Sequence, residues 1–150
     1  MLLLLLCTLT SAAIGAEDLD LRRYSGRVVV LDFWASWCGP CRQSVPWLNE
    51  MHARYADRGL VVVGVNVDAD RADADRFLRS VPARFTVIYD PAGSIARQYK
   101  LEGMPTSFVF APDGKLLSTH IGFLNAQRQQ REAELVQALA MQTARRQQHE

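Results

Sequence analysis

Continuous apolar runs alternate with stretches of helical spacing over most of this chain. Apolar, β-branched runs that contain almost no polar positions are typical of strands buried on both faces of a sheet. We predict two such strands, at Val28–Trp34 and Leu60–Val67. A shorter strand is predicted at Phe85–Tyr89. Between them, apolar residues recur every three or four positions, as on one face of a helix. We predict helices at Cys38–Arg58, Asp70–Ser80 and Ser94–Lys100.

The last third of the chain follows a different pattern. Thr106–Ala111 predicts a strand, and the turn-forming residues Pro112, Asp113 and Gly114 predict a hairpin after it. A more alternating strand then covers Lys115–Ile121, and a helix runs from Asn125 to about Arg145. Alternating strands and helices favour parallel pairing, and the hairpin adds antiparallel strands. The expected fold class is therefore α/β, with a mixed central β-sheet flanked by helices.

Length and charge narrow the possible functions. The 150 residues suit one domain, and 49% hydrophobic with 22% charged residues is the usual balance of a globular protein. The formal net charge is only +1. Such a chain lacks the basic field that attracts nucleic acid, so we expect no nucleic-acid partner.

The first residues differ from the rest. Leu2–Leu6 is a leucine run, and small residues precede the first charge at Glu17. This pattern predicts a signal peptide over residues 1–16, cleaved near Ala16, although no basic residue precedes the apolar run. A retained short anchor or a buried first helix are the alternatives. We expect one domain over residues 17–145 and a flexible tail at 146–150.

The number and spacing of the cysteines indicate a reactive pair and not a structural disulfide. The chain has three cysteines, and Cys7 lies within the predicted signal peptide. A mature chain would keep Cys38 and Cys41, which are too close in sequence for a disulfide between them to stabilise the fold much. We therefore expect this pair to act in a reaction.

The Cys38-x-x-Cys41 motif follows a predicted strand and opens a predicted helix. Unpaired N–H groups and the helix dipole at that end favour an anion, so the pKa of the Cys38 thiol should be lowered. At this spacing the two Cα atoms should lie about 5–6 Å apart, within disulfide range. Cys38 could then attack a substrate disulfide, and Cys41 could resolve the mixed disulfide.

Two other interpretations of the motif stay open at this point. A C-x-x-C pair can form half of a zinc site, but the three histidines, His52, His120 and His149, show no ligand-like pairing. We therefore expect no metal. An inert structural pair is the other alternative, and the strand–motif–helix context argues against it.

The amino-acid sequence around the motif resembles the active-site segment of thioredoxins. The matching segment is Val30-Leu31-Asp32-Phe33-Trp34-Ala35-Ser36-Trp37-Cys38-Gly39-Pro40-Cys41-Arg42. Pro46 matches the proline inside the family's active-site helix, and Gly103-Met104-Pro105-Thr106 resembles its cis-proline loop. Two separated motifs in the right order imply the thioredoxin fold.

Within that superfamily the chain is similar to the TlpA/ResA-type exported thiol–disulfide oxidoreductases. Three features carry this similarity: the FWASWCGPC sequence, the VNVD segment at Val65–Asp68 and an additional αβ insertion between Asp70 and Asp90. The resemblance implies a periplasmic or membrane-anchored monomer. It also implies that a membrane thiol-reducing carrier supplies electrons and that disulfide-bearing client proteins receive them, as in cytochrome c biogenesis.

The resemblance also implies roles for residues around the cysteines. Pro105 would have a cis peptide bond, and Met104 would offer backbone groups to a substrate strand. Trp37, Gly39 and Pro40 would form the rest of the substrate-binding surface. Trp47 has two interpretations, as a groove wall or as core.

Asp32 interrupts an apolar strand just before the motif. Burial there should raise the pKa of its carboxyl, which suits a proton acceptor for Cys41. A strand-end aspartate that reaches solvent is the alternative. The resemblance identifies Asp32 with the buried acid of thioredoxins.

Together these observations predict a protein-disulfide reductase that uses Cys38 and Cys41 and needs no cofactor beyond their redox-active disulfide. A disulfide oxidase or isomerase is one alternative. A non-catalytic assembly or metallochaperone module with the same fold is another.

Overall fold

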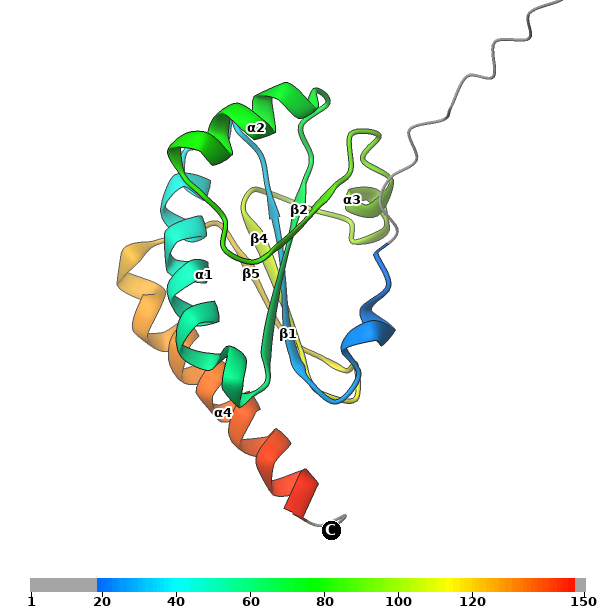
Figure 1. Ribbon diagram of the computed structural model, residues 1–150, viewed down its shortest axis with the longest axis vertical. Helices are drawn as coiled ribbons and strands as arrows, with labels where there is room; N and C mark the ends of the chain where they lie inside the picture. The colour runs from blue at the N-terminus through cyan, green and yellow to red at the C-terminus, as the bar shows by residue number, and fades with distance from the viewer. Residues whose placement is uncertain (1–18, 148–150) are drawn as a thin grey trace, which may run out of the picture.

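A computed structural model describes residues 19–147 of the chain (Figure 1). Its centre is a five-stranded sheet in the order β3-β2-β1-β4-β5. The strands are β1 (Val28–Trp34), β2 (Leu60–Asn66), β3 (Thr86–Tyr89), β4 (Thr106–Phe110) and β5 (Leu116–Ile121). β1, β2 and β3 pair in parallel, whereas β4 is antiparallel to both β1 and β5. The mixed sheet predicted from the sequence is confirmed.

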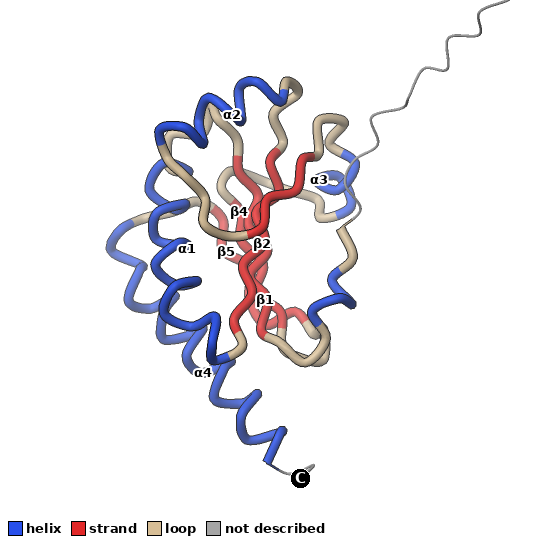
Figure 2. Tube along the Cα trace, in the orientation of Figure 1, coloured by secondary structure: helices blue, strands red, loops and turns tan. Residues whose placement is uncertain are grey.

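Helices cover both faces of this sheet, as Figure 2 shows with the sheet nearly edge-on. The α-helices are α1 (Cys41–Tyr55), α2 (Arg71–Ser80), α3 (Ser94–Gln98) and α4 (Arg128–Gln147). Short 3-10 helices are η1 (Leu21–Tyr24), η2 (Ala56–Arg58) and η3 (Asn125–Gln127). α1 and α4 lie on one side of the sheet, and α3 and η1 lie on the other (Figure 2). α2 and β3 form the predicted insertion, with β3 at one sheet edge.

Burial on both faces explains the apolar run of β1, in which every residue is buried. Val30 and Trp34 belong to the core layer that also contains α1 and α4 side chains, whereas Leu31 and Phe33 belong to the opposite layer. Successive side chains of a strand point to opposite faces. Asp32 therefore projects into the α1–α4 layer, between Val30 and Trp34.

The active-site helix begins three residues later than predicted, at Cys41 instead of Cys38. Residues before it form turns, in which the Cys38 N–H donates to the Ala35 carbonyl and the Cys41 N–H donates to the Cys38 carbonyl. The helix also ends at Tyr55, before the short η2 turn and Gly59. Gly59 has a φ of 104°, a left-handed conformation that glycine adopts without strain.

The predictions for the two ends of the chain concern a signal peptide at the start and a helix followed by a tail at the end. α4 continues to Gln147, past the predicted helix end near Arg145. The predicted signal peptide over residues 1–16 and the end of the predicted tail, residues 148–150, lie outside the described residues. Within residues 19–147, no helix has both the length and the apolar composition needed to cross a bilayer.

Candidate active site

Cys38 and Cys41 form a disulfide at the junction between β1 and α1. Their Cα atoms are 5.3 Å apart, as the spacing predicts. Cys38 lies in the loop that leaves the carboxyl end of β1, and Cys41 is the first residue of α1. Cys38 is 4% exposed and Cys41 is fully buried. A partner that approaches this site therefore meets Cys38 first.

The surface beside Cys38 is made by the residues that surround it in the sequence. Trp37 is 69% exposed, although large apolar side chains are usually buried. Gly39 and Pro40 are also exposed. An exposed indole next to a reactive group is typical of a surface that contacts partners.

The loop before β4 adjoins the same end of β1. The Met104–Pro105 peptide bond is cis, as the resemblance implies. The next residue, Thr106, pairs with Phe33 near the end of β1. The Pro105 carbonyl accepts a hydrogen bond of 2.7 Å from the Gly122 N–H. Met104 packs against the core cluster that contains both cysteines.

Asp32 is fully buried beneath this end of the sheet. The Ser107 hydroxyl donates a hydrogen bond of 2.6 Å to Asp32 Oδ1, whereas Oδ2 has no partner among the described residues. Burial raises the pKa of the Asp32 carboxyl to about 7, against the opposing effects of the Ser107 hydrogen bond and the Arg131 charge. The alternative of a solvent-exposed strand-end aspartate is wrong.

Asp68 holds the cysteine loop, a contact that the sequence analysis did not assign. Its carboxylate accepts hydrogen bonds from the Ser36 N–H at 2.9 Å and from the Ser36 hydroxyl at 2.8 Å. The Asn66 amide donates to the same carboxylate at 2.7 Å. Asp68 is only 4% exposed. The available signal was an acid two residues after a buried strand, within the VNVD segment.

The other aromatic and basic residues near the motif have structural contacts. Trp34 is fully buried, and Trp47, 5% exposed, packs against Phe123, which assigns Trp47 to the core. The Arg42 guanidinium lies 5.1 Å from the centre of the Phe77 ring of α2. Arg42 therefore contacts the insertion.

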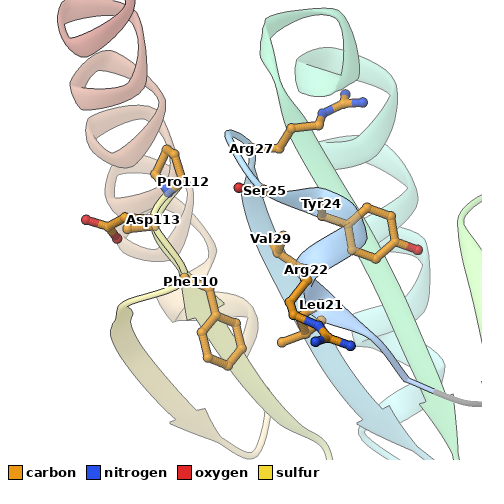
Figure 3. Close-up of a pocket in the computed structure, with 11 residues that line it drawn as sticks. Leu21, Arg22, Tyr24, Ser25, Arg27, Val29, Phe110, Pro112 and Asp113 are labelled. Carbon is orange, nitrogen blue, oxygen red and sulfur yellow. The ribbon is translucent and has the colours of Figure 1, made fainter.

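A pocket of about 290 Å³ lies at the opposite end of the sheet (Figure 3). Leu21 and Tyr24 of η1 form one side, and Phe110 and Pro112 form the other. It adjoins the start of β1, whereas the disulfide follows the end of that strand. Val29 lines the pocket, so the five residues Val30–Trp34 of β1 separate it from the cysteine loop, a span of roughly 17 Å at the usual rise. This pocket is therefore not part of the cysteine site.

Across residues 19–147, no three His, Cys, Asp or Glu side chains gather in a way that could hold a metal ion. The only cysteine pair of that region is already joined as a disulfide.

A disulfide-bonded C-x-x-C at a strand–helix junction, beside a cis-proline loop, defines a protein of the thioredoxin superfamily. The Redoxin family model matches residues 6–139, and the chain belongs to this family. It is 30% identical to the thiol-disulfide oxidoreductase ResA of Bacillus thuringiensis subsp. konkukian (strain 97-27) over 101 residues. That match covers 67% of this chain but only 58% of the ResA chain.

Solved structures agree with this assignment. A protein of Chlorobium tepidum, named provisionally as the thiol:disulfide interchange protein DsbE, superposes with a TM-score of 0.77 at 52% identity. The match covers 79% of this chain and 84% of that one. StoA of Bacillus subtilis superposes with a TM-score of 0.62 at 24% identity, over 73% and 84% of the two chains, and supports the fold. The chain is thus a TlpA/ResA-like thioredoxin-fold protein.

Proposed function

We propose that this protein is a thiol–disulfide oxidoreductase whose reacting groups are Cys38 and Cys41. The observation that carries the proposal is the disulfide between them, with Cys38 4% exposed and Cys41 fully buried at the start of a 15-residue helix. The names of the ResA and DsbE relatives support the same activity.

The first step is attack by Cys38 on a client disulfide. In the reduced protein the Cys38 sulfur lies beside the amino end of α1, where the helix dipole stabilises a thiolate. The thiolate forms a bond to one client sulfur, the client disulfide breaks, and the other client sulfur leaves as a thiolate. The exposed Trp37, Gly39 and Pro40, with Met104 and Pro105 opposite, are proposed to contact the client.

The second step resolves the mixed disulfide. Cys41 transfers its proton to the Asp32 carboxylate and attacks the Cys38 sulfur. The Cys38–Cys41 disulfide forms, and the bond to the client breaks, so that the client has gained two electrons. Asp32 is suited to this role because it projects into the layer that contains Cys41 and its pKa lies near neutrality.

Reduction of exported client proteins is the proposed direction. A membrane thiol carrier would return the two electrons to the disulfide, and the periplasm would be the site of action of a monomer. The redox potential of the pair tests the direction, because a strongly oxidising potential would favour the oxidase or isomerase alternative.

Trapping with Cys41→Ser tests the activity itself. Without the resolving thiol, mixed disulfides between Cys38 and clients should persist and should be released by dithiothreitol. Cys38→Ser with Cys41 intact is the matched control and should trap nothing. Full activity of Cys38→Ser in cells would contradict the proposal and favour the non-catalytic module.

A further inference from the structure

The side of α4 that faces the sheet begins with a buried arginine. The buried positions of this helix recur at helical spacing, at Arg131, Leu135, Ala138, Leu139 and Gln142. Arg131 is only 5% exposed, and its Nε atom has no hydrogen-bond partner among the described residues. Burial of a charge costs free energy, and an apolar side chain would fill the position without that cost. The arginine therefore needs an explanation other than packing.

The Arg131 guanidinium contacts the segment that follows β5. Its Nη2 donates hydrogen bonds to the Gly122 carbonyl at 2.9 Å and to Gln127 Oε1 at 3.0 Å. The guanidinium carbon lies 5.4 Å from the centre of the Phe123 ring. Hydrogen bonds from a charged donor are stronger than those between neutral groups. Arg131 therefore fixes Gly122 and Phe123 from inside the molecule.

The same segment holds the cis-proline loop. The Gly122 N–H donates to the Pro105 carbonyl at 2.7 Å. One residue earlier, Ile121 lies against Gly103, where a Cβ atom would come within 2.9 Å of Ile121 Cγ2. The loop is thus supported at two points. Hydrogen bonds link Arg131 to Gly122, and Gly122 to Pro105.

We propose that Arg131 is a positioning residue, which holds the cis-proline loop where it binds the client. The inference rests on the proposed function, in which Met104 and Pro105 contact the client opposite Cys38. Because Arg131 is buried, it acts through Gly122 and not by contact with the client. Such a role has a large effect on rate, since a displacement of 1 Å in a positioning group can cost about a hundredfold.

The Arg131 charge also acts on Asp32, and the test must separate this effect from loop positioning. The charge lowers the pKa of the Asp32 carboxyl, against the larger effect of burial. Asp32 takes part in the second step, in which Cys41 resolves the mixed disulfide. Attack by Cys38 on the client comes before that step. In a Cys41→Ser background, the rate of attack therefore reports on the loop without the contribution of Asp32.

Two disulfides distinguish loop positioning from general damage to the site. Insulin presents its disulfides on peptide chains, and a peptide must lie against the cis-proline loop to react. Hydroxyethyl disulfide is small and uncharged and has no peptide backbone, so it can reach Cys38 without the loop. Each is mixed with the reduced Cys41→Ser protein, and formation of the mixed disulfide is followed by mass spectrometry after acid quenching.

Arg131→Met is the decisive variant, because methionine fills the buried position but cannot donate to the Gly122 carbonyl. It should slow attack on insulin roughly tenfold, a part of the loss that a displaced positioning group can cause. Attack on hydroxyethyl disulfide should stay within about twofold of the rate with arginine, because this disulfide needs no loop contact. Equal slowing with both disulfides, or no slowing with insulin, would overturn the inference.

Two further variants guard against effects of folding and of charge. Arg128→Met is the matched control, since Arg128 lies on the same helix and pairs with Glu50 at the surface. It should leave both rates unchanged. Arg131→Gln, which is shorter than arginine and uncharged, gives the same test if the methionine variant does not fold. Unchanged attack on insulin by the glutamine variant would then overturn the inference.

A double variant tests the link through the cis-proline loop. If Arg131 acts through Pro105, Arg131→Met should cause no further slowing with insulin in a Pro105→Ala background. A further tenfold slowing there would overturn the inference. The Cys41→Ser protein with Arg131 intact tests the proposed function separately. If it forms no mixed disulfide with either reagent, the proposed function fails, and the positioning role fails with it. Normal attack on insulin by Arg131→Met would overturn only the positioning role.

Discussion

Burial of the Asp32 carboxyl group should destabilise the folded protein at neutral pH. The native pKa is about 7, compared with 3.8 for an unperturbed aspartate. Between these values the native state keeps a proton that the unfolded state has lost. The free energy of unfolding should therefore fall as pH rises from about 4 to 7 and then level off.

Asp32→Asn should remove this pH dependence, because the amide does not ionise. At pH 8 the variant should be more stable than the wild type by on the order of 4 kcal/mol, and the gain should shrink toward pH 5. Urea unfolding of the oxidised protein at both pH values measures the difference. Asp57→Asn, at an exposed position of η2, controls for the loss of a carboxylate. An equal effect of Asp32→Asn at pH 5 and pH 8 would refute the assignment.

Single residues differ in how much the sequence reveals about them. Asp32 was detectable because it interrupts an apolar run that only a buried strand explains. Ser107 was not, because its proximity to Asp32 depends on the register of β1 and β4, which no local pattern fixes. Arg131 was missed for a different reason, because a basic residue on a polar helix usually faces solvent.

The loop between β1 and α1 is held from a different element. Asp68, after β2, accepts hydrogen bonds from the N–H and the hydroxyl of Ser36, two residues before Cys38. Asp68→Asn replaces these with weaker bonds to a neutral amide. It should lower the free energy of unfolding by about 1–3 kcal/mol. It should also change the rate at which iodoacetamide alkylates reduced Cys38, because the loop is no longer fixed.

Asp90→Asn is the matched control for this prediction. Asp90 is fully buried and accepts hydrogen bonds from Ser94 and the Ala96 N–H at the start of α3, on the other side of the sheet. Its loss should destabilise the protein without changing Cys38 alkylation. A similar change of alkylation in both variants would show that Asp68 has no particular influence on the cysteine loop.

Elements with strong apolar patterns were predicted well, and their boundaries less so. The apolar runs located β1 and β2, because burial on both faces leaves almost no polar positions. The start of α1 was placed at Cys38 because helical spacing does not distinguish a turn from the first helical residues. The observed turns at residues 36–37 and 39–40 delay the helix to Cys41.

At the scale of the whole molecule, the residues of the proposed site come from elements far apart in sequence. β1 contributes Asp32, the loop after β1 contributes Cys38, the loop before β4 contributes Pro105, and β4 contributes Ser107. The order β3-β2-β1-β4-β5 makes these neighbours, because β4 returns antiparallel beside β1. The fold class could be predicted from alternating elements, whereas this adjacency at the site came only from the resemblance and the structure.

The last turns of α4 pack against the end of the sheet where β1 and β2 begin, opposite the end that carries the cysteines. Gln142 is 4% exposed, and its Oε1 accepts a hydrogen bond of 3.2 Å from the Val28 N–H at the start of β1. It also lies against Gly59, where a Cβ atom would come within 2.2 Å of the Gln142 amide. The side chain therefore joins α4 to the points where β1 and β2 begin.

A chain that ends after Ala140 should be less stable than one that ends after Gln147, because it lacks this contact. Loss of the hydrogen bond to the Val28 N–H should lower the free energy of unfolding by about 1 kcal/mol, which corresponds to a fall in Tm of roughly 3 °C or more. Gln142→Ala in the full chain separates the side chain from helix length and should give most of that fall. Thermal unfolding of the oxidised protein measures both. If Gln142→Ala leaves Tm unchanged while the shorter chain loses stability, helix length and not the Gln142 contact holds this end together.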